Sequence, residues 1–535
     1  MNEPLRGHAK GTVAPATTVD RDQLSRVTIA NSFANLVRAA SGSFENIVLP
    51  VVLIAVLSRA DYSNWALVFS IAAYITYLDF GLQTATQALV ARSLAARDEF
   101  SAAQAARAGL RVYFTVAGCA LLVAAMTART LPVLFPDIPN GTVDEASLTL
   151  LVLAAGQAAN LGVNVVAGYY AGAHRSHVTA YSIAIARCVS LALSVWGACA
   201  GQTLPVIALG YSCPLALTFV AVLVKVLRET RLARTGDERQ RARERITARS
   251  LLRYSGPLVL WNVCSIFVGA AGTAIVGRVD YAAVAYFSIA MMLTIAVTGI
   301  DNALLQPFLT NIGRSIASDS ETRASAVLSA LRLNSGLLLL LITIGMGAYV
   351  VMGRQGLVSD SVTSLLTTAL VVAATGVRLA MTPFNMAFLS SNDHRRIIAQ
   401  PIIEAAVAVG AGLALGAVFG ALGVAYASFA SALIAVAMLL LWSLRSSVWH
   451  RDLKANQALR ALAPAAACTV LVLALDIAIA LVEITSTMTI LIQAALIVGA
   501  CLIALRAAPA HAQAVLLKML SRPLDLLHRK HKDGS

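Results

Sequence analysis

The sequence contains few charged side chains. Asp, Glu, Lys and Arg account for only 13% of the 535 residues, and aromatic side chains for 6%, whereas soluble domains carry about 25% charged residues. Hydrophobic side chains make up 58% of the chain, and the mean hydropathy is +0.75. This composition excludes an ordinary soluble domain and is typical of a membrane protein with many spans.

Features of catalytic and metal-binding proteins are also missing. The seven cysteines stand singly, without a Cys-x-x-Cys pair, and none of the eight histidines falls in an apolar segment. The sequence has no His-Glu-x-x-His, no Gly-x-Ser-x-Gly and no Walker loop. We therefore expect no metal site, no cofactor and no catalytic residues. A membrane-embedded glycosyltransferase or polymerase is the minor alternative.

Acidic residues are scarce relative to basic ones, which gives a net charge of +14. In a soluble protein this excess would suggest nucleic acid, but here the basic residues lie in short loops between apolar segments. Cytosolic loops of membrane proteins carry such an excess of Lys and Arg. The charge therefore predicts a membrane topology and no nucleic-acid partner.

Apolar segments long enough to cross a bilayer core of about 30 Å recur along the chain. If the N-terminus is cytosolic, the outer loops hold four of the 41 Lys and Arg, three lie within spans, and the other 34 lie in inner loops and tails. Omitting one span would destroy this asymmetry. The sequence predicts fourteen transmembrane helices with both termini cytosolic, at about 28–57, 63–91, 108–128, 147–170, 178–199, 204–226, 254–277, 283–311, 333–352, 361–391, 398–419, 421–442, 461–482 and 487–506.

The chain contains one stretch twice. Arg59-Ala60-Asp61-Tyr62 is followed by Phe69-Ser70-Ile71-Ala72, and Arg278-Val279-Asp280-Tyr281 is followed by Phe287-Ser288-Ile289-Ala290. From the Phe onward the register holds without a gap, so that Gly81 aligns with Gly299. We interpret the match as an ancestral duplication.

Each copy falls in the outer turn between the first and second helix of a six-helix unit, and because six is even, both units have the same orientation. The predicted fold class is an all-α polytopic membrane protein of about fourteen transmembrane helices, with two parallel six-helix repeats that form two lobes around a central cavity, plus two extra C-terminal helices. The predicted domains are a cytosolic N-terminal tail (1–26), an N-lobe (27–226), a basic cytosolic linker (227–253), a C-lobe (254–444), two appended helices (445–506) and a cytosolic amphipathic, basic tail (507–535). The linker is either a solvated connection or a helix lying on anionic lipid, and the tail is expected to form an interfacial helix.

Ionisable residues lie deep within the predicted spans, where an Arg costs about 2.5–3.5 kcal/mol on the insertion scale. Arg38 and Asp79 lie at similar depth, so one interpretation is an ion pair that fixes helix packing. Arg187 and Arg378 have no acid within a helical turn, which favours the other interpretation, a cationic cavity. On that view, loss of Arg378 should hardly affect folding but should abolish transport. The acids are candidates for ion coupling or ion pairing: Glu45, Asp79, Asp301 and Glu404.

Polar stripes favour the cavity, although amides also often hydrogen-bond to neighbouring helices. One stripe lies on a face of the fourth predicted helix, a second contains Thr375 and Thr382 beside Arg378 on the tenth, and a third shares the face of Arg38 on the first. The predicted substrate-binding set combines these stripes with the arginines: Arg38, Arg187, Arg378, Asn31, Asn35, Gln157, Asn160, Asn164 and Asn385.

Short motifs around the second and seventh predicted helices resemble a known family. Tyr62 to Tyr74, the run Asp79-Phe80-Gly81-Leu82 and Val90-Ala91-Arg92 are similar to the second-helix signature of Wzx-type polysaccharide flippases of the MOP (multidrug/oligosaccharidyl-lipid/polysaccharide) exporter superfamily. Ser255-Gly256-Pro257 and Val284-Ala285-Tyr286 also resemble that family. The likeness covers the first twelve helices. One departure is that members often carry an acidic residue in the middle of helix seven, where this chain has no charge.

The resemblance implies a flippase that moves an undecaprenyl-diphosphate-linked oligosaccharide from the cytoplasmic to the periplasmic leaflet of a bacterial inner membrane, by alternating access, for exopolysaccharide, O-antigen or capsule synthesis. Arginines suit this substrate because they bind diphosphate through paired, charge-assisted donors. The expected partners are the lipid-linked oligosaccharide and membrane lipids, with a polysaccharide polymerase and co-polymerase as further candidates. The alternatives are a peptidoglycan lipid II flippase and a MATE-like cation-coupled drug antiporter.

The charge asymmetry makes a direct prediction about topology. Reporter fusions at Gly236, at Asn456 and at the C-terminus should report a cytosolic location, and fusions at Pro139 and Ser359 a periplasmic one. Alkaline phosphatase and fluorescent-protein fusions in a bacterial inner membrane measure the location. An inverted reading at any of these sites contradicts the fourteen-span topology.

Overall fold

A computed structural model of the chain contains only helices among the residues that it describes. These are residues 18–79, 81–96, 98–232, 263–264, 267–269, 271–315, 320–359, 361–385, 399–445, 455–481 and 485–507. Most of the predicted N-terminal tail, the linker from residue 233, the Ser255-Gly256-Pro257 motif and the C-terminal amphipathic tail lie outside the described residues.

The helices are long because a backbone N–H or C=O without a partner in hydrocarbon costs several kcal/mol, and a helix satisfies these groups internally. Ten of the described helices are long and apolar enough to cross a membrane. The elements in chain order are α1 (Thr18–Val56), α2 (Arg59–Tyr77), α3 (Leu82–Ala95), α4 (Glu99–Leu134), η1 (Asn140–Thr142), α5 (Val143–Gly172), α6 (His177–Cys199), α7 (Leu204–Leu232), α9 (Ala271–Val279), η4 (Tyr281–Ala283), α10 (Val284–Ser315), α11 (Ser320–Arg354), α12 (Val362–Ala380), α15 (Ala399–Arg445), α16 (Ala455–Leu481) and α17 (Ser486–Ala507).

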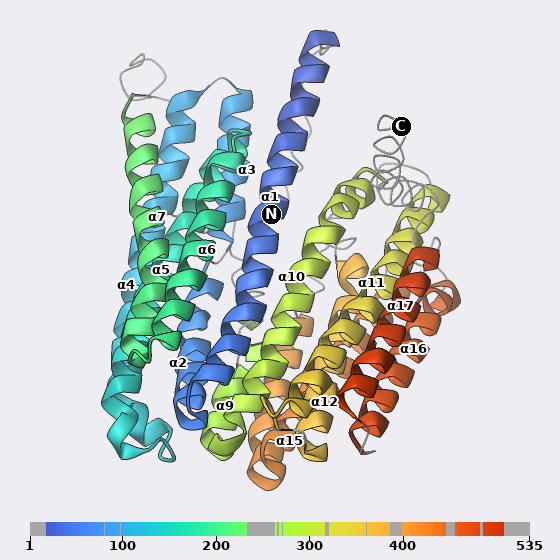
Figure 1. Cartoon of the computed structure of the whole chain (residues 1–535). Coiled ribbons are helices and arrows are strands. Elements are labelled where there is room, and N and C mark those ends of the chain that lie inside the picture. Colours follow the sequence, from blue (N-terminus) through green and yellow to red (C-terminus); the bar gives the residue numbers. More distant parts are fainter. Residues whose placement is uncertain are drawn as a thin grey trace, which may run out of the picture.

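The predicted number of spans fits this order. The two segments of α2 and α3 occupy the second predicted span, and α9 forms the end of the seventh. The 47-residue α15 contains two spans, which meet at Gly420 as the sequence predicts. The first helix begins at Thr18, inside the stretch predicted as a tail, and it projects beyond the rest of the bundle (Figure 1).

The bundle divides into two lobes, which confirms the predicted fold class. Helices α1 to α7 form one lobe, which we call the N-lobe, and α9 to α15 form the other, the C-lobe (Figure 1). Helix α1 packs against both α6 and α10, so it lies where the lobes meet. Helices α16 and α17 both pack against α11, on the side of the C-lobe away from the N-lobe.

Helix α5 is the centre of the N-lobe, and it packs against α2, α3, α4 and α7. Glycines permit these close approaches. A methyl group at Gly156 would lie 2.4 Å from Oγ of Ser212 on α7, and one at Gly168 would lie 2.4 Å from the carbonyl oxygen of Gln83 on α3. Small residues allow such packing in membranes, where the hydrophobic effect does not drive helices together.

The second predicted helix is not continuous, so the expectation that Asp79 lies in the middle of a helix is wrong. Helix α2 ends at Tyr77, and Gly81 has a φ of 69° before α3 begins. Because Gly has no Cβ, it adopts this left-handed conformation without strain. The Asp79 carboxylate accepts a hydrogen bond from the Gln83 amide at 3.3 Å, which satisfies one of the free donors at the start of α3. The aligned Gly299 lies within the unbroken α10.

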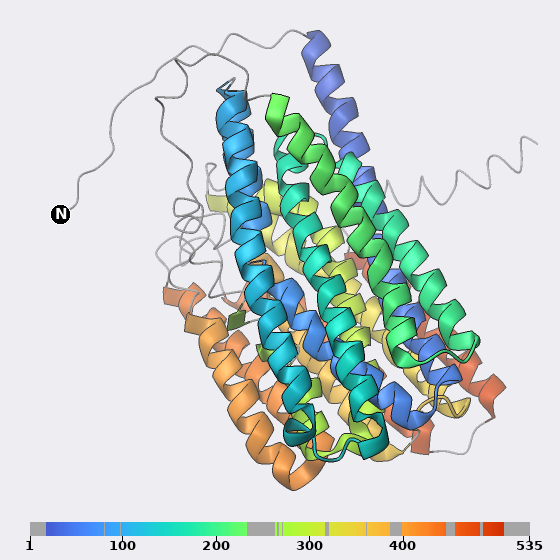
Figure 2. The same ribbon diagram turned by 90° about the vertical axis from the view of Figure 1, so that its left-hand side faces the viewer.

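The two copies of the duplicated motif use their aspartates differently. Ser58 caps α2 and donates a hydrogen bond to Asp61 at 2.6 Å. Asp280 instead accepts from the Ala421 amide at 3.3 Å, and so caps the second limb of α15 at the Gly420 bend. Figure 2 shows the two limbs of α15, in orange, meeting at this bend. The aspartate therefore joins two turns on the side of the bundle that the charge pattern predicts to be periplasmic.

The lobes are joined on that side by both tyrosines of the duplicated motif. The Tyr62 hydroxyl of the N-lobe accepts a hydrogen bond from Ser288 of the C-lobe at 3.3 Å. Reciprocally, the Tyr281 hydroxyl of the C-lobe donates to the side-chain oxygen of Asn64. Tyr62 is fully buried, so these contacts lie within the seam and close it at the predicted periplasmic end.

The Gly420 bend gives a prediction about stability. Its φ of 60° and ψ of −141° are accessible to glycine alone, and a methyl group there would lie 2.6 Å from Oδ2 of Asp280. We expect Gly420→Ala to destabilise the fold by about 1–3 kcal/mol, the cost of such backbone strain. The apparent Tm of the purified protein in detergent measures the loss.

Gly410→Ala in the same helix is the matched control, because a methyl group at Gly410 meets no atom within 4 Å. This control should leave the Tm unchanged or raise it, since alanine favours the helix over glycine. Equal Tm values for the two variants would contradict the role of the bend.

Candidate functional site

The α1 and α6 helices bring Arg187 and Glu45 together. The Nη1 atom of Arg187 lies 3.6 Å from Oε2 of Glu45, whose side chain is only 4% exposed. The expectation that Arg187 lacks an acidic neighbour is therefore wrong, because the acid comes from another helix. Gly42 makes the approach possible, since a methyl group at this position would lie 2.1 Å from Nη1 of Arg187.

Arg38 lies on α1, one turn before Gly42. Its side chain is half-buried, and it is close enough to Arg187 for the two positive charges to interact. Within the described part of the chain, no acidic side chain forms an ion pair with Arg38, so the predicted alternative of an Arg38–Asp79 pair is not formed there. Arg38 thus adds a second positive charge beside the Arg187–Glu45 pair, and the cluster carries an excess of positive charge.

The polar stripe of α5 reaches this cluster through Tyr211 of α7. Tyr211 forms a side-chain hydrogen bond with Gln157 and lies near both Glu45 and Arg187. Gln157 is buried, with 4% of its surface exposed. The cluster thus connects four helices of the N-lobe, α1, α5, α6 and α7. Of the other two residues of this stripe, the structure buries Asn160 and leaves Asn164 half-buried.

The amides of Asn31 and Asn35 bind the beginning of α6. Asn31 donates to the His174 carbonyl at 2.8 Å and accepts from the His177 amide at 3.2 Å. Asn35 donates to Oγ of Ser176 at 3.5 Å. The amide groups at a helix start need acceptors, so these contacts attach α1 to α6 and keep Arg38 on the N-lobe.

Arg378 is paired in the structure, and the expectation that it has no acidic partner is wrong. Its Nε lies 2.5 Å from Oε1 of Glu404, and its Nη2 donates to the Ser428 carbonyl at 2.9 Å and to Oγ of Ser431 at 3.0 Å. Gln400 donates to the second Glu404 oxygen at 3.2 Å. The guanidinium is therefore engaged in joining α12 to both limbs of α15.

The remaining predicted residues lie apart from these clusters. Helix α12 ends at Ala380 with a turn at Met381, so the predicted stripe from Thr375 to Asn385 does not follow one continuous helix. The side-chain oxygen of Asn385 is buried without a hydrogen-bond partner. Asp301 on α10 is fully buried, and neither of its carboxyl oxygens has a hydrogen-bond partner.

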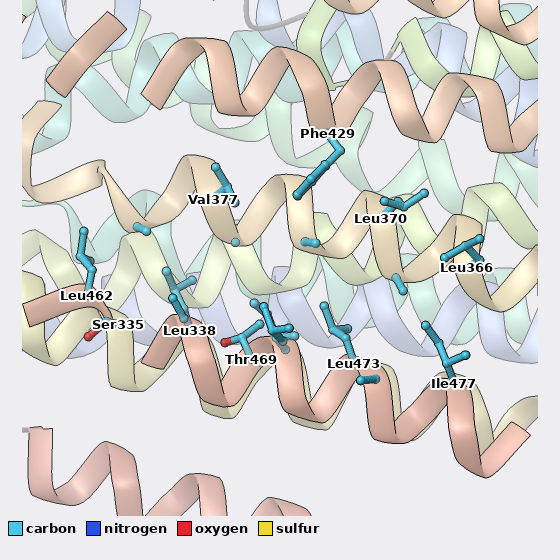
Figure 3. A pocket seen from close by; sticks show the side chains of 18 residues that line it. Ser335, Leu338, Leu366, Leu370, Val377, Phe429, Leu462, Thr469, Leu473 and Ile477 are labelled. Carbon is cyan, nitrogen blue, oxygen red and sulfur yellow. The ribbon is translucent and has the colours of Figure 1, made fainter. Parts of the chain in front are cut away.

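An apolar cavity lies beside the appended helices, and no pattern in the sequence predicted it. This cavity of about 420 Å³ lies between α11, α12 and α16 and is lined almost entirely by hydrocarbon (Figure 3). Small residues such as Ala369, Ala373 and Gly376 on α12 face Leu473 and Ile477 on α16 across it. Its shape and apolar lining suit a hydrocarbon chain and offer almost no hydrogen-bond partners to a polar ligand.

Comparison with known proteins gives a family match for one part of the chain and a fold match for nearly all of it. Residues 39–196 match the MatE family model. Comparison with curated proteins finds no match. Among solved structures, the lipid II flippase MurJ in an inward closed conformation is similar with a TM-score of 0.62 and 11% identity, over 93% of this chain and 99% of that one.

Two MATE structures are similar over less of the chain. An inward-facing multidrug resistance MATE family transporter of the MOP superfamily has a TM-score of 0.55 and 16% identity, covering 78% of this chain and 99% of its own. The eukaryotic MATE transporter AtDTX14 has a TM-score of 0.56 and 14% identity, covering 82% of this chain and 99% of its own. The chain therefore has the fold that these proteins share.

The Arg378–Glu404 pair gives a prediction about folding. Removing one partner of a buried ion pair leaves an uncompensated charge and costs about 3–5 kcal/mol, whereas replacing both partners with apolar residues is often neutral. We therefore expect Arg378→Met to lower the Tm and the yield of folded protein. The double variant Arg378→Met with Glu404→Leu should recover most of the loss. A single variant as stable as the native protein would show that the pair does not stabilise the fold.

Proposed function

We propose that this protein is a transporter of the MOP superfamily that moves an undecaprenyl-diphosphate-linked oligosaccharide across a bacterial inner membrane. The substrate passes from the cytoplasmic to the periplasmic leaflet, where a polysaccharide polymerase and co-polymerase use it to build a surface polysaccharide. Transport proceeds by alternating access between the two lobes, and both termini lie in the cytosol.

The observation that carries this proposal is the excess positive charge at Arg38 and Arg187. An unpaired arginine within a span is costly, so a chain that retains Arg38 half-buried and without an acidic partner in the described residues has a use for its charge. A diphosphate offers oxygens to both guanidinium groups, and Arg binds such oxygens in a planar, bidentate manner. We assign the headgroup to these two arginines.

The ion pair of Arg378 is the reason why the headgroup site is assigned to Arg38 and Arg187 alone. Its guanidinium already contacts Glu404, Ser428 and Ser431, so binding a diphosphate there would first require breaking a buried ion pair. Arg187 shares Glu45 at the longer distance of 3.6 Å, its side chain is 25% exposed, and its Nε has no hydrogen-bond partner. Arg187 is therefore held by fewer contacts than Arg378, so turning its guanidinium towards a ligand breaks fewer of them.

The apolar cavity between α11, α12 and α16 supports a lipid substrate. A polyprenyl tail gains little free energy by leaving the bilayer, because lipid is as apolar as the cavity walls. The cavity therefore contributes orientation rather than affinity: it holds the first part of the tail in a fixed place while the headgroup binds elsewhere. A small drug-like cation has no comparable use for a hydrocarbon-lined space of about 420 Å³.

The helices beyond the duplication favour a lipid flippase over a drug antiporter. The likeness to the lipid II flippase extends over 93% of this chain, whereas the likeness to the two MATE transporters stops at 78% and 82%. A lipid II flippase is therefore the second candidate, since its substrate carries the same polyprenyl diphosphate. The two candidates differ in the glycan, which neither arginine contacts in our assignment.

The conformation agrees with access from the cytoplasmic leaflet. The seam between the lobes is closed at the predicted periplasmic end by the contacts of Tyr62 with Ser288 and of Tyr281 with Asn64. Near the opposite end, Asn31 and Asn35 bind the cytosolic half of α1 to α6 of the same lobe. Rocking of the lobes about α1 and α10 would open the first set of contacts and leave the second intact.

Substitution of Arg38 tests the proposal in proteoliposomes that contain a fluorescent undecaprenyl-diphosphate oligosaccharide. Arg38→Ala should reduce the flipping rate at least about tenfold, because loss of one charged contact typically removes 1.4 kcal/mol or more. Arg38→Lys keeps the charge but loses the bidentate geometry, so it should restore part of the rate. Folding should be unaffected, since Arg38 has no ion pair among the described residues.

Arg129→Ala is the matched control, because Arg129 is exposed at the far end of α4 and its loss should not change the rate. Flipping by Arg38→Ala at the native rate would refute the assigned headgroup site. Replacing the labelled lipid with lipid II separates the two candidates, since each predicts faster movement of its own substrate.

A further inference from the structure

A buried carboxyl group lies where the two appended helices meet the C-lobe. Asp476 of α16 is 0% exposed, and Gln493 of α17 is 3% exposed. The Gln493 side-chain nitrogen donates to Oδ1 of Asp476 at 2.7 Å. The pair lies within the bilayer-spanning part of both helices, because Asp476 precedes the end of α16 at Leu481 and Gln493 follows the start of α17 at Ser486.

Two hydrogen-bond acceptors of this pair have no donor. The second carboxyl oxygen of Asp476, Oδ2, is buried and has no partner, and the same is true of Oε1 of Gln493. Both atoms are acceptors, so neither can satisfy the other. One additional donor between them would satisfy both, and a proton on Oδ2 is such a donor.

Among the described side chains, none with a positive charge contacts Asp476. An isolated carboxylate in an apolar interior is so unfavourable that the group becomes neutral instead. Gln493 is the side-chain partner recorded for Asp476, and no charged group of the described chain contacts it. The charged and titratable groups described on the helices around it are Arg332, Tyr349 and Arg354 on α11, Arg378 on α12, Arg460 and Cys468 on α16, and Cys501 and Arg506 on α17.

The nearest of these charges serves another group. Arg354 donates to the Ile479 carbonyl at 2.8 Å, one turn from Asp476 along α16. Arg378 is engaged by Glu404, and the other arginines are exposed. No cation in the described part of the protein therefore neutralises the Asp476 carboxylate. Protonation is the remaining way to remove its charge.

A glycine of α11 holds the amide in position. Gly347 has no side chain, and a methyl group there would lie 2.7 Å from Oε1 of Gln493. The amide therefore lies directly on the backbone of α11 while its nitrogen binds Asp476 on α16. In this way one amide group connects all three helices.

We propose that Asp476 is a proton-binding site, in which the neutral acid and the amide of Gln493 form a paired hydrogen bond that holds the α16–α17 hairpin against α11. The proton sits on Oδ2 and is donated to Oε1 of Gln493, while Oδ1 accepts from the amide nitrogen. Loss of the proton leaves a carboxylate facing an amide oxygen, which repels it and loosens the hairpin.

This site controls the wall of the apolar cavity. Leu473, Ala474 and Ile477 line the cavity from the same turns of α16 that carry Asp476 (Figure 3). Binding of a proton therefore fixes the cavity wall, and its loss lets the wall move. The inference concerns protonation of the protein and does not depend on which lipid is transported.

Thermal unfolding of the full-length protein in detergent between pH 5 and pH 9 tests the site, with Asp476→Asn as the main variant. Asn is neutral at every pH and can form the same two hydrogen bonds with Gln493. The fold favours the neutral acid, so its contribution to stability is present at low pH and is lost as the pH rises. Because an unfolded Asp ionises near pH 3.9, part of this contribution is already lost at pH 5. The Tm of the variant should therefore exceed the native Tm slightly at pH 5 and by about 1–3 °C at pH 9.

Asp144→Asn is the control for loss of a negative charge, because Asp144 is exposed at the start of α5; it should show no such widening gap. Gly347→Ala should push the amide off Asp476 and lower the native Tm at pH 5. The infrared spectrum at pH 5 gives a second measurement, since the carbonyl stretch of protonated acids should be weaker in Asp476→Asn than in the native protein.

Three results would overturn the proposal. A Tm gap that does not change with pH shows that the acid does not titrate, and an Asp476→Asn protein that fails to fold at pH 5 shows that the neutral form is not the native one. A Tm of the native protein at pH 8 that rises in sodium but not in choline, with no such rise in Asp476→Asn, shows that the site holds a metal cation instead.

Discussion

The interior of a bilayer offers no water to a charge, so a charged side chain within a span is costly unless a partner in the protein compensates it. Three buried acids of this chain have partners of different kinds. Glu45 lies beside Arg187, Glu404 is tightly paired with Arg378, and Asp476 shares the amide of Gln493. In each case the partner comes from a different helix, so the same contacts that compensate the charges also fix which helices pack together.

Arg38 and Asp301 depart from this pattern. Arg38 is half-buried beside a second arginine, and within the described chain no acid pairs with it. Asp301 is fully buried, and neither of its carboxyl oxygens has a hydrogen-bond partner. A charge left without a partner within a span is costly; in the function proposed above, the diphosphate of the lipid substrate compensates Arg38.

Glycines leave space against the helix backbone for the side chains of the polar clusters. The guanidinium of Arg187 lies over Gly42, and the amide of Gln493 lies over Gly347. In both places a methyl group would occupy the position of the polar atom. Helices of a membrane protein gain close contact through such residues, and here the same residues provide space for the side chains that carry charge or a proton.

Both lobes contain the repeated motif, but some of its residues make different contacts in each lobe. The tyrosines of the repeated motif close the seam between the lobes from opposite sides, so the repeat still acts as a pair. Its aspartates have separated in role: Asp61 belongs to the start of α2, whereas Asp280 caps the bend of α15 at Gly420. The helix break at Gly81 is absent at the aligned Gly299.

The sequence by itself determined the class of protein, a bundle of many spans in two lobes, and the bend at Gly420, because hydropathy and glycine are local signals. The sequence also identified the ionisable side chains that lie within the predicted spans. Only the tertiary structure decided how they are compensated, since the acid that pairs with Arg378 lies 26 residues away and the acid that pairs with Arg187 lies on α1. Spacing along one helix cannot reveal a partner on another, and for this reason Arg378 looked free in the sequence although it is paired, whereas Arg38 has no acidic partner within the described chain.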